Sequence, residues 1–230
     1  MGRNLKIGFV ILFLGFLSCK NGDQRHKTKE LNHIYTEYSF WGEEEKEFIT
    51  GLFQFRPGGE KSTPAKLNAP AAVALDGAFI NADSAGFTGT FYEIHQPFES
   101  FSGKHTITFT SEDGEQHSET FTFTPFHLST EPGDEVSREQ MVLSFTGLED
   151  NDLVRVVITD TSFSSNGINE IDTIHNGQLD LSAKLKRNVK NGPVLLHIFK
   201  EEERLLQKNP HINGKISITY SLKREFELRD

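Results

Sequence analysis

The chain has 230 residues, 24 of them basic and 33 acidic, and a formal net charge of −9 at neutral pH. This balance argues against nucleic acid and against anionic membrane surfaces as partners, because both are bound through basic patches. Cys19 is the single cysteine. An intramolecular disulfide is therefore impossible, and stability has to come from buried cores.

The first 19 residues have the layout of an export signal. Arg3 and Lys6 precede an apolar run from Ile7 to Leu17, and Ser18 and Cys19 follow. A helix needs roughly 20 apolar residues to span a bilayer, and this run is clearly shorter. We therefore expect an export signal in residues 1–18 and no transmembrane anchor there.

The segment Phe16-Leu17-Ser18-Cys19 resembles the lipobox of bacterial lipoproteins, although Phe16 stands where an aliphatic residue is usual. The resemblance implies cleavage before Cys19, acylation of Cys19 and attachment to a lipid bilayer. It also implies residence in the cell envelope of a Gram-negative bacterium, as an outer membrane lipoprotein facing the periplasm or the cell surface. The alternative is an ordinary secretory signal with an incidental cysteine.

Cleavage at that point would make the protein still more acidic. Residues 1–18 contain two basic residues and no acidic one, so 22 basic and 33 acidic residues would remain, for a net charge of −11. Residues 19–32 are mostly polar and lack an apolar period, which is typical of a flexible tether.

The rest of the chain shows apolar residues at every second position, with turn signals about every ten residues. This pattern favours antiparallel all-β structure. Strands are expected at Ile34–Phe40, Glu47–Phe55, Ala71–Leu75, Thr90–His95, Lys104–Thr110, His117–Thr124, Gln140–Phe145, Leu153–Asp160, Ile168–Ile174, Gln178–Leu181, Pro193–Lys200 and Lys215–Leu228. A short helix is expected at Ala183–Lys190, closed by Asn191-Gly192.

The segment Phe126–Ser137 is rich in turn-forming residues and marks a domain boundary. We expect one β-sandwich in residues 33–126 and a second in residues 127–230. Two such blocks of short strands resemble tandem immunoglobulin-like or fibronectin-like domains, without the Cys-Trp-Cys core of true immunoglobulin domains. A single large sandwich is the alternative architecture.

One hairpin has a register that the sequence defines. A two-residue turn at Asp113-Gly114 would split its large apolar side chains between both faces. A three-residue loop, Glu112-Asp113-Gly114, instead places Ile107, Phe109, Phe121 and Phe123 on one face, which favours it by several kcal/mol at about 1.5 to 3 kcal/mol for each buried residue. The opposite face then carries a comb of hydroxyls: Thr106, Thr108, Thr110, Ser118, Thr120, Thr122 and Thr124.

This comb is most simply the solvated side of a sheet, because threonine is a β-branched strand former. Alternating threonines also resemble the ice-binding faces of some antifreeze proteins, but those faces are long and flat, whereas a sandwich sheet twists. A glycan-binding or protein-binding face is the other alternative.

The sequence offers no catalytic, cofactor or metal motif. It lacks His-x-His, His-Glu-x-x-His, Gly-x-Ser-x-Gly and every Gly-x-Gly pattern. We therefore expect no catalytic residues, no cofactor and no metal ligands. The loop Glu149-Asp150-Asn151-Asp152 carries four oxygen-bearing side chains, and calcium binding there is an alternative.

Two short segments, Asp83-Ser84-Ala85 and Asp172-Thr173-Ile174, resemble the sequon for O-glycosylation of exported proteins in some Gram-negative bacteria. The resemblance implies Ser84 and Thr173 as possible glycosylation sites.

Together these features predict an anchored envelope protein with a non-enzymatic binding or structural role, whose partner is an unidentified protein or a glycan. A carbohydrate-binding accessory lipoprotein is one alternative, for which Trp41, Tyr92 and Phe163 are the first aromatic residues to consider. An envelope hydrolase with residues gathered from distant parts of the chain is another.

Overall fold

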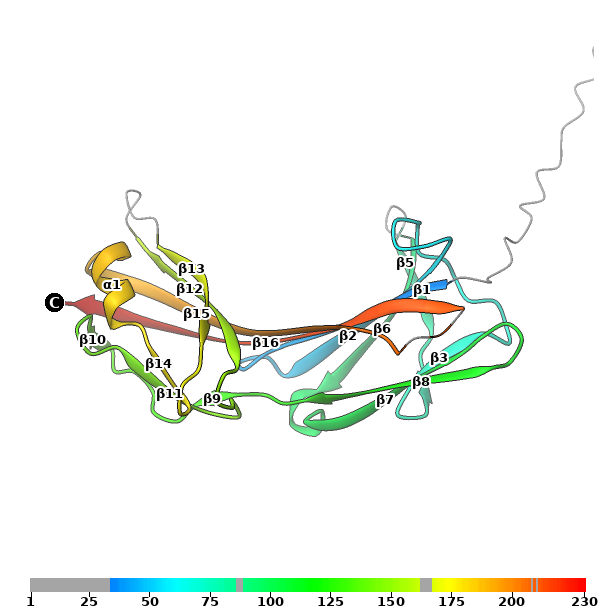
Figure 1. The fold of residues 1–230 in the computed structure, drawn as a ribbon, viewed down its shortest axis with the longest axis horizontal. Coiled ribbons are helices and arrows are strands. Elements are labelled where there is room, and N and C mark those ends of the chain that lie inside the picture. Colours follow the sequence, from blue (N-terminus) through cyan, green and yellow to red (C-terminus); the bar gives the residue numbers. More distant parts are fainter. Residues whose placement is uncertain (1–33, 86–88, 162–166, 208, 210) are drawn as a thin grey trace, which may run out of the picture.

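The computed structural model describes residues 34–85, 89–161, 167–207, 209 and 211–230. The expected signal peptide and tether, with Cys19, lie outside these residues. The described chain is almost entirely β-structure, arranged as one long sheet that faces two smaller sheets (Figure 1). The prediction of an all-β sandwich protein is confirmed.

The long sheet has nine strands. In spatial order they are β13 (Ile168–Thr173), β12 (Leu153–Asp160), β15 (Gly192–Leu205), β16 (Ile212–Arg229), β1 (Ile34–Glu43), β2 (Phe48–Pro57), β6 (Gly89–Pro97) and β5 (Ala82–Ala85), while β10 (Glu135–Ser137) pairs with the end of β16. A short 3-10 helix, η1 (Phe98–Ser100), follows β6.

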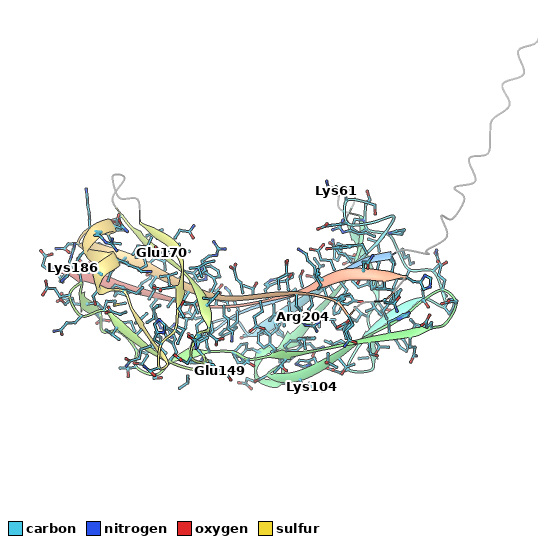
Figure 2. All side chains as sticks on the ribbon, viewed as in Figure 1. Lys61, Lys104, Glu149, Glu170, Lys186 and Arg204 are labelled. Atoms are coloured by element: carbon cyan, nitrogen blue, oxygen red, sulfur yellow. The ribbon has the colours of Figure 1, made fainter. Side chains whose placement is uncertain are left out.

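The two smaller sheets lie end to end beneath the long sheet in Figure 1. One has the order β4 (Ala78–Phe79), β3 (Ala72–Leu75), β7 (Gly103–Thr110) and β8 (Gln116–Phe123). The other has the order β14 (Gln178–Asp180), β11 (Val142–Thr146) and β9 (His127–Leu128). Figure 2 shows side chains filling the space between the layers.

Buried and exposed residues alternate along each long strand, and this alternation decides which side chains enter the space between the sheets. Along β1, Ile34, Thr36, Tyr38 and Phe40 are buried, while the residues that alternate with them, Tyr35, Glu37 and Ser39, are partly exposed. The same alternation recurs in β12, in the first half of β15 and in most of β16. Each long strand therefore contributes one apolar row to the core and leaves the other row on the open face of the long sheet.

The expected division of the chain needs a correction at this point. Between β8 and β9, near residues 126 and 127, the chain does pass from one smaller sheet to the other. The long sheet, however, does not break there, because the first ten residues of β16 pair with β1. The last part of β16 lies against the other small sheet in Figure 1. Residues 127–230 thus supply a strand to the sandwich of residues 33–126, and the two sandwiches share one sheet.

The strand pairings are mostly antiparallel, as expected, but two are not. β1 pairs with β16 in parallel, and β10 pairs with β16 in parallel. Neither pairing is signalled by a local turn, because the partner strands are far apart in the chain.

The predicted hairpin register is confirmed. Phe109 pairs with His117, His105 with Phe121 and Gly103 with Phe123. Gly114 has φ +86° in the three-residue loop, the left-handed conformation that glycine adopts without strain. The apolar residues of both strands consequently face the core.

The helix and several short strands differ from expectation. Helix α1 spans Ser182–Asn188 and ends where Val189 becomes extended, so Asn191-Gly192 does not close it. Strand β5 occupies a stretch expected to be a turn, and β10 lies within the expected boundary segment. β15 continues for five residues past Lys200 through a charged run, because its whole length pairs with β16.

An aromatic cluster lies where the two halves meet. The ring of Tyr220 on β16 is stacked with Phe98 and packs edge-on against Phe123 and Phe126, at centroid distances of 5.6, 5.9 and 5.2 Å. Phe123 ends β8 and Phe126 precedes β9. The core is therefore continuous from one half to the other.

Candidate functional site

The open face of the long sheet carries a groove of about 660 Å³ near the middle of the molecule. Its lining comes from β1, β2, β15, β16 and the β1–β2 turn, and consists of Trp41, Gly42, Glu43, Glu45, Lys46, Glu47, Phe48, Thr50, His197, Phe199, Thr219 and Ser221. In Figure 1 the long sheet bows so that both of its ends rise above this middle section.

Aromatic residues stand on both sides of the groove. Trp41 and Phe48 form one side and are 42% and 50% exposed. Phe199 forms the other side on β15, and β16 runs between β1 and β15. Because neighbouring strands are about 4.8 Å apart, the strands that carry Trp41 and Phe199 are separated by about 9.6 Å.

The register places these residues on the same face. Trp41 pairs with Thr219, and Ser221, two residues further along β16, pairs with Phe199. Residues two apart in a strand point to the same side of the sheet. Thr219 and Ser221 therefore form a hydroxyl-bearing floor between the two aromatic sides.

His197 supports one side of the groove. Its ring packs on Phe199 with centroids 3.6 Å apart and planes at 36°. Nε2 of His197 is buried and has no hydrogen-bond partner among the described residues. Burial lowers the pKa of His197, with a smaller contribution in the same direction from Lys223. The neutral ring is thus favoured, which suits packing against an aromatic neighbour.

The charges of the groove are mainly negative. Glu43 accepts a hydrogen bond from Lys223 Nζ at 2.8 Å, and this bond is the main reason that the pKa of Glu43 is lowered. Glu45 and Glu47 lie on the β1–β2 turn with Lys46 between them. Among the described residues, neither Glu45 nor Glu47 forms an ion pair.

This arrangement is suited to binding. Ligand sites commonly combine aromatic surface with a few placed polar groups, and the groove has both. The lowered pKa of Glu43 favours its ionised carboxylate, which only accepts hydrogen bonds. The groove thus offers Glu43 as a hydrogen-bond acceptor.

Of the three aromatic residues that the sequence singled out, Trp41 lies in the groove. Tyr92 does not, because it is buried in the core and its hydroxyl accepts a hydrogen bond from the Leu67 N–H at 2.8 Å. Phe163 lies outside the described residues. Phe48, His197 and Phe199 were not identified from the sequence.

The threonine comb lies on the outer face of the β7–β8 hairpin. Thr106 pairs with Thr120 and Thr108 with Ser118, as the predicted register requires. Ser118, Thr120 and Thr122 are exposed, and Thr106 and Thr108 are partly exposed. The comb therefore carries hydroxyls without the aromatic surface present in the groove.

The acidic loop is held as a turn by its own side chains. Asp150 accepts a hydrogen bond from the Asn176 N–H at 2.9 Å, and Asp152 accepts one from the Glu149 N–H at 2.8 Å. Asp152 also forms an ion pair with Lys200 at 2.9 Å. Within the described part of the chain, no group of three or more His, Cys, Asp or Glu side chains is placed to hold a metal ion.

His105 and His117, on the β7–β8 hairpin, have structural contacts. His105 is buried between Asp76 Oδ2 at 2.7 Å and the Phe101 carbonyl at 2.8 Å. His117 Nδ1 lies 3.1 Å from the Asn209 side-chain amide. They belong to opposite ends of the β7–β8 hairpin.

The three modification sites remain predictions. Cys19 lies outside the described residues. Ser84 belongs to β5 through its backbone, and its side chain lies outside the described part. Thr173 ends the edge strand β13, where it is half-buried opposite Leu153. Among the described residues, no helix has the length and apolarity to cross a membrane.

Comparison with known proteins places the chain in no family. No protein-family model and no curated protein matches it. Among solved structures, the chain is similar to "Crystal structure of DIP-gamma IG1+IG2", with 9% identity, 84% of this chain and 98% of that chain covered, and a TM-score of 0.25. A TM-score this low does not show a shared fold, so the sandwich architecture rests on the described sheets themselves.

Proposed function

We propose that this protein is an envelope lipoprotein of a Gram-negative bacterium, anchored in the outer membrane through acylated Cys19. In this role it is a non-enzymatic binding module, with a protein or glycan as its partner. The lipobox-like segment before Cys19 supports the anchor. The aromatic-sided groove supports the binding role and is the single observation that carries it.

Labelling with palmitate tests the anchor. The full chain, expressed in a Gram-negative host, is expected to incorporate radiolabelled palmitate, and Cys19→Ala is expected to abolish the label. Ser18→Ala is the matched control, because it changes the neighbouring residue and keeps the thiol. A chain that takes up no palmitate, or whose label survives Cys19→Ala, would remove the lipoprotein assignment.

Photocrosslinking in intact cells tests the binding role. A photoreactive residue in place of Thr219, on the groove floor, is expected to give a crosslinked product after irradiation. The same residue in place of Thr108, on the threonine comb, is the control and is expected to give none. Crosslinking from Thr108 alone would place the binding surface on the comb and contradict the proposal.

A further inference from the structure

The groove differs from a general apolar patch in how its surfaces are arranged. A flat ring held between two aromatic surfaces needs a van der Waals contact of about 3.5 to 4 Å on each side, or 7 to 8 Å in all. Trp41 and Phe199 lie diagonally across β16, because Trp41 pairs with Thr219 and Phe199 with Ser221. Two residues along a strand add about 6.8 Å to the roughly 9.6 Å across it, so the two backbones are about 12 Å apart. Side chains lean along the strand direction, which shortens this span and leaves room for one such ring. The ring of Phe199 is already fixed on one side by His197.

The floor and rim present hydrogen-bonding groups rather than apolar atoms. Thr219 and Ser221 bring hydroxyls that both donate and accept, while Glu43, Glu45 and Glu47 bring carboxylates that only accept. A ligand with many hydroxyl groups satisfies all of these at once. A purely apolar ligand would bury them without partners, at a cost for each group.

The backbone around the groove argues against a peptide strand as the occupant. Extended peptides usually bind by pairing with a free sheet edge. β1 is paired with β2 and β16, and over the groove β16 is paired with β1 and β15. The backbone N–H and C=O groups at the groove are therefore already hydrogen-bonded to neighbouring strands. A bound peptide would find side chains only, whereas a sugar needs no backbone pairing.

The charge of the groove further restricts the chemical class of the ligand. Three carboxylates line it against one lysine, and the whole chain is acidic. A polyanionic ligand would be repelled. We propose that the groove binds an extended, neutral oligosaccharide chain, with a sugar ring between the Trp41 and Phe199 sides. This inference rests on the proposed binding function and names its ligand class.

Trp41 is the only tryptophan of the chain, so its fluorescence reports directly on the groove. The full-length protein, in a detergent without a sugar headgroup, is titrated with neutral hexasaccharides of β-1,4-linked glucose, xylose, mannose and N-acetylglucosamine. Heparin serves as the polyanionic probe. At least one neutral probe is expected to give a saturable change that high salt leaves unaltered, and heparin is expected to give none.

Three variants locate the binding. Phe199→Ala and Phe48→Ala each remove one aromatic surface while keeping the reporter, and each is expected to weaken binding by about tenfold. Phe48 is half-exposed, so its replacement preserves the fold. Phe79→Ala is the matched control, because Phe79 is exposed on another sheet, and it is expected to bind as the unmodified chain does.

The inference is overturned if every neutral probe fails to give a saturable change, if heparin binds in their place, or if the groove variants bind as tightly as Phe79→Ala. These outcomes separate it from the proposed function. Crosslinking of a protein from Thr219 in cells, with no response to the saccharides, would keep the binding role and exclude the sugar. Failure of both the crosslinking and the saccharide titration would contradict both the binding role and the oligosaccharide ligand.

Discussion

Gly214 on β16 lies opposite Thr36 on β1, in the parallel pairing that joins the two halves of the chain. Its φ is +154°, and a Cβ atom there would lie 1.9 Å from the Thr36 carbonyl oxygen. Thr36 is itself fully buried and reaches Asn213 O at 3.4 Å through its hydroxyl. The close approach of the two backbones therefore depends on the missing side chain.

Replacing this glycine tests how tightly the strands are packed. Gly214→Ala is expected to lower the free energy of unfolding by about 2 to 4 kcal/mol, from the clash together with backbone strain. Gly77→Ala is the control, because Gly77 also has positive φ but open space around it, and about 1 kcal/mol is expected. Denaturant unfolding measures both. Equal losses would show that only backbone strain matters.

His197 gives the stability a pH dependence with a defined sign. Because burial lowers its pKa in the folded state, the unfolded chain binds the proton more readily below its ordinary pKa of 6.5. Stability from this group is therefore complete above pH 6.5 and falls as the pH drops through that value toward the folded pKa.

The variant His197→Asn cannot take up this proton, so it is expected to lose less stability between pH 7 and pH 5 than the unmodified chain. Urea unfolding at both pH values measures the difference. His95→Asn is the control, because His95 is exposed and lies outside the groove. An unchanged pH dependence in His197→Asn would contradict the assigned cause.

At the scale of single elements, strands were predictable wherever apolar residues alternate with polar ones over a full strand, as in β12, whose bounds Leu153–Asp160 match the expectation. β5 and the second half of β15 lack this alternation. They form strands because they pair with a neighbouring strand. Their backbone partners, rather than their own side chains, determine them.

The β7–β8 hairpin provides a test of register. Deleting Glu112 leaves Asp113-Gly114 as a two-residue turn between Ser111 and Glu115, so the strand pairs, including Phe109 with His117, keep their register. Because Phe121 and Phe123 stay on the buried face, the deletion is expected to cost only about 1 kcal/mol of unfolding free energy. Glu112→Ala, which keeps the loop length, is expected to stay within about 0.5 kcal/mol. Denaturant unfolding measures both, and a loss of about 3 to 6 kcal/mol on deletion, the burial of two phenylalanines, would contradict the register argument.

The candidate site could be predicted from the sequence only in part. Trp41 stood out because it is the single tryptophan. Phe199 is separated from it by more than 150 residues, and the two share a face only because β16 pairs with both of their strands. The one local signal was the run Val194–Phe199, where apolar residues also occupy the outward positions of the strand.

At the scale of the whole molecule, the shared sheet predicts that the two halves fold together. Residues 34–126 alone would leave one edge of β1 without its ten-residue pairing to β16. We expect this fragment to lack a cooperative thermal transition, and the full chain to unfold in a single transition. Circular dichroism and amide NMR spectra measure both. A fragment with dispersed NMR spectra and a cooperative thermal transition would show that residues 34–126 fold as an independent domain, which would contradict this prediction.

Occupation of the groove in the cell tests directly whether the open face of the long sheet is the binding surface. Thr219→Cys and Thr108→Cys each place one thiol, in the groove or on the threonine comb, in a chain whose own Cys19 is expected to be acylated. Their reaction rates with N-ethylmaleimide are measured in intact cells and again after purification. Slower labelling in cells is expected for Thr219→Cys only, because a bound partner covers the groove. Equal rates in cells and after purification for Thr219→Cys would contradict this expectation.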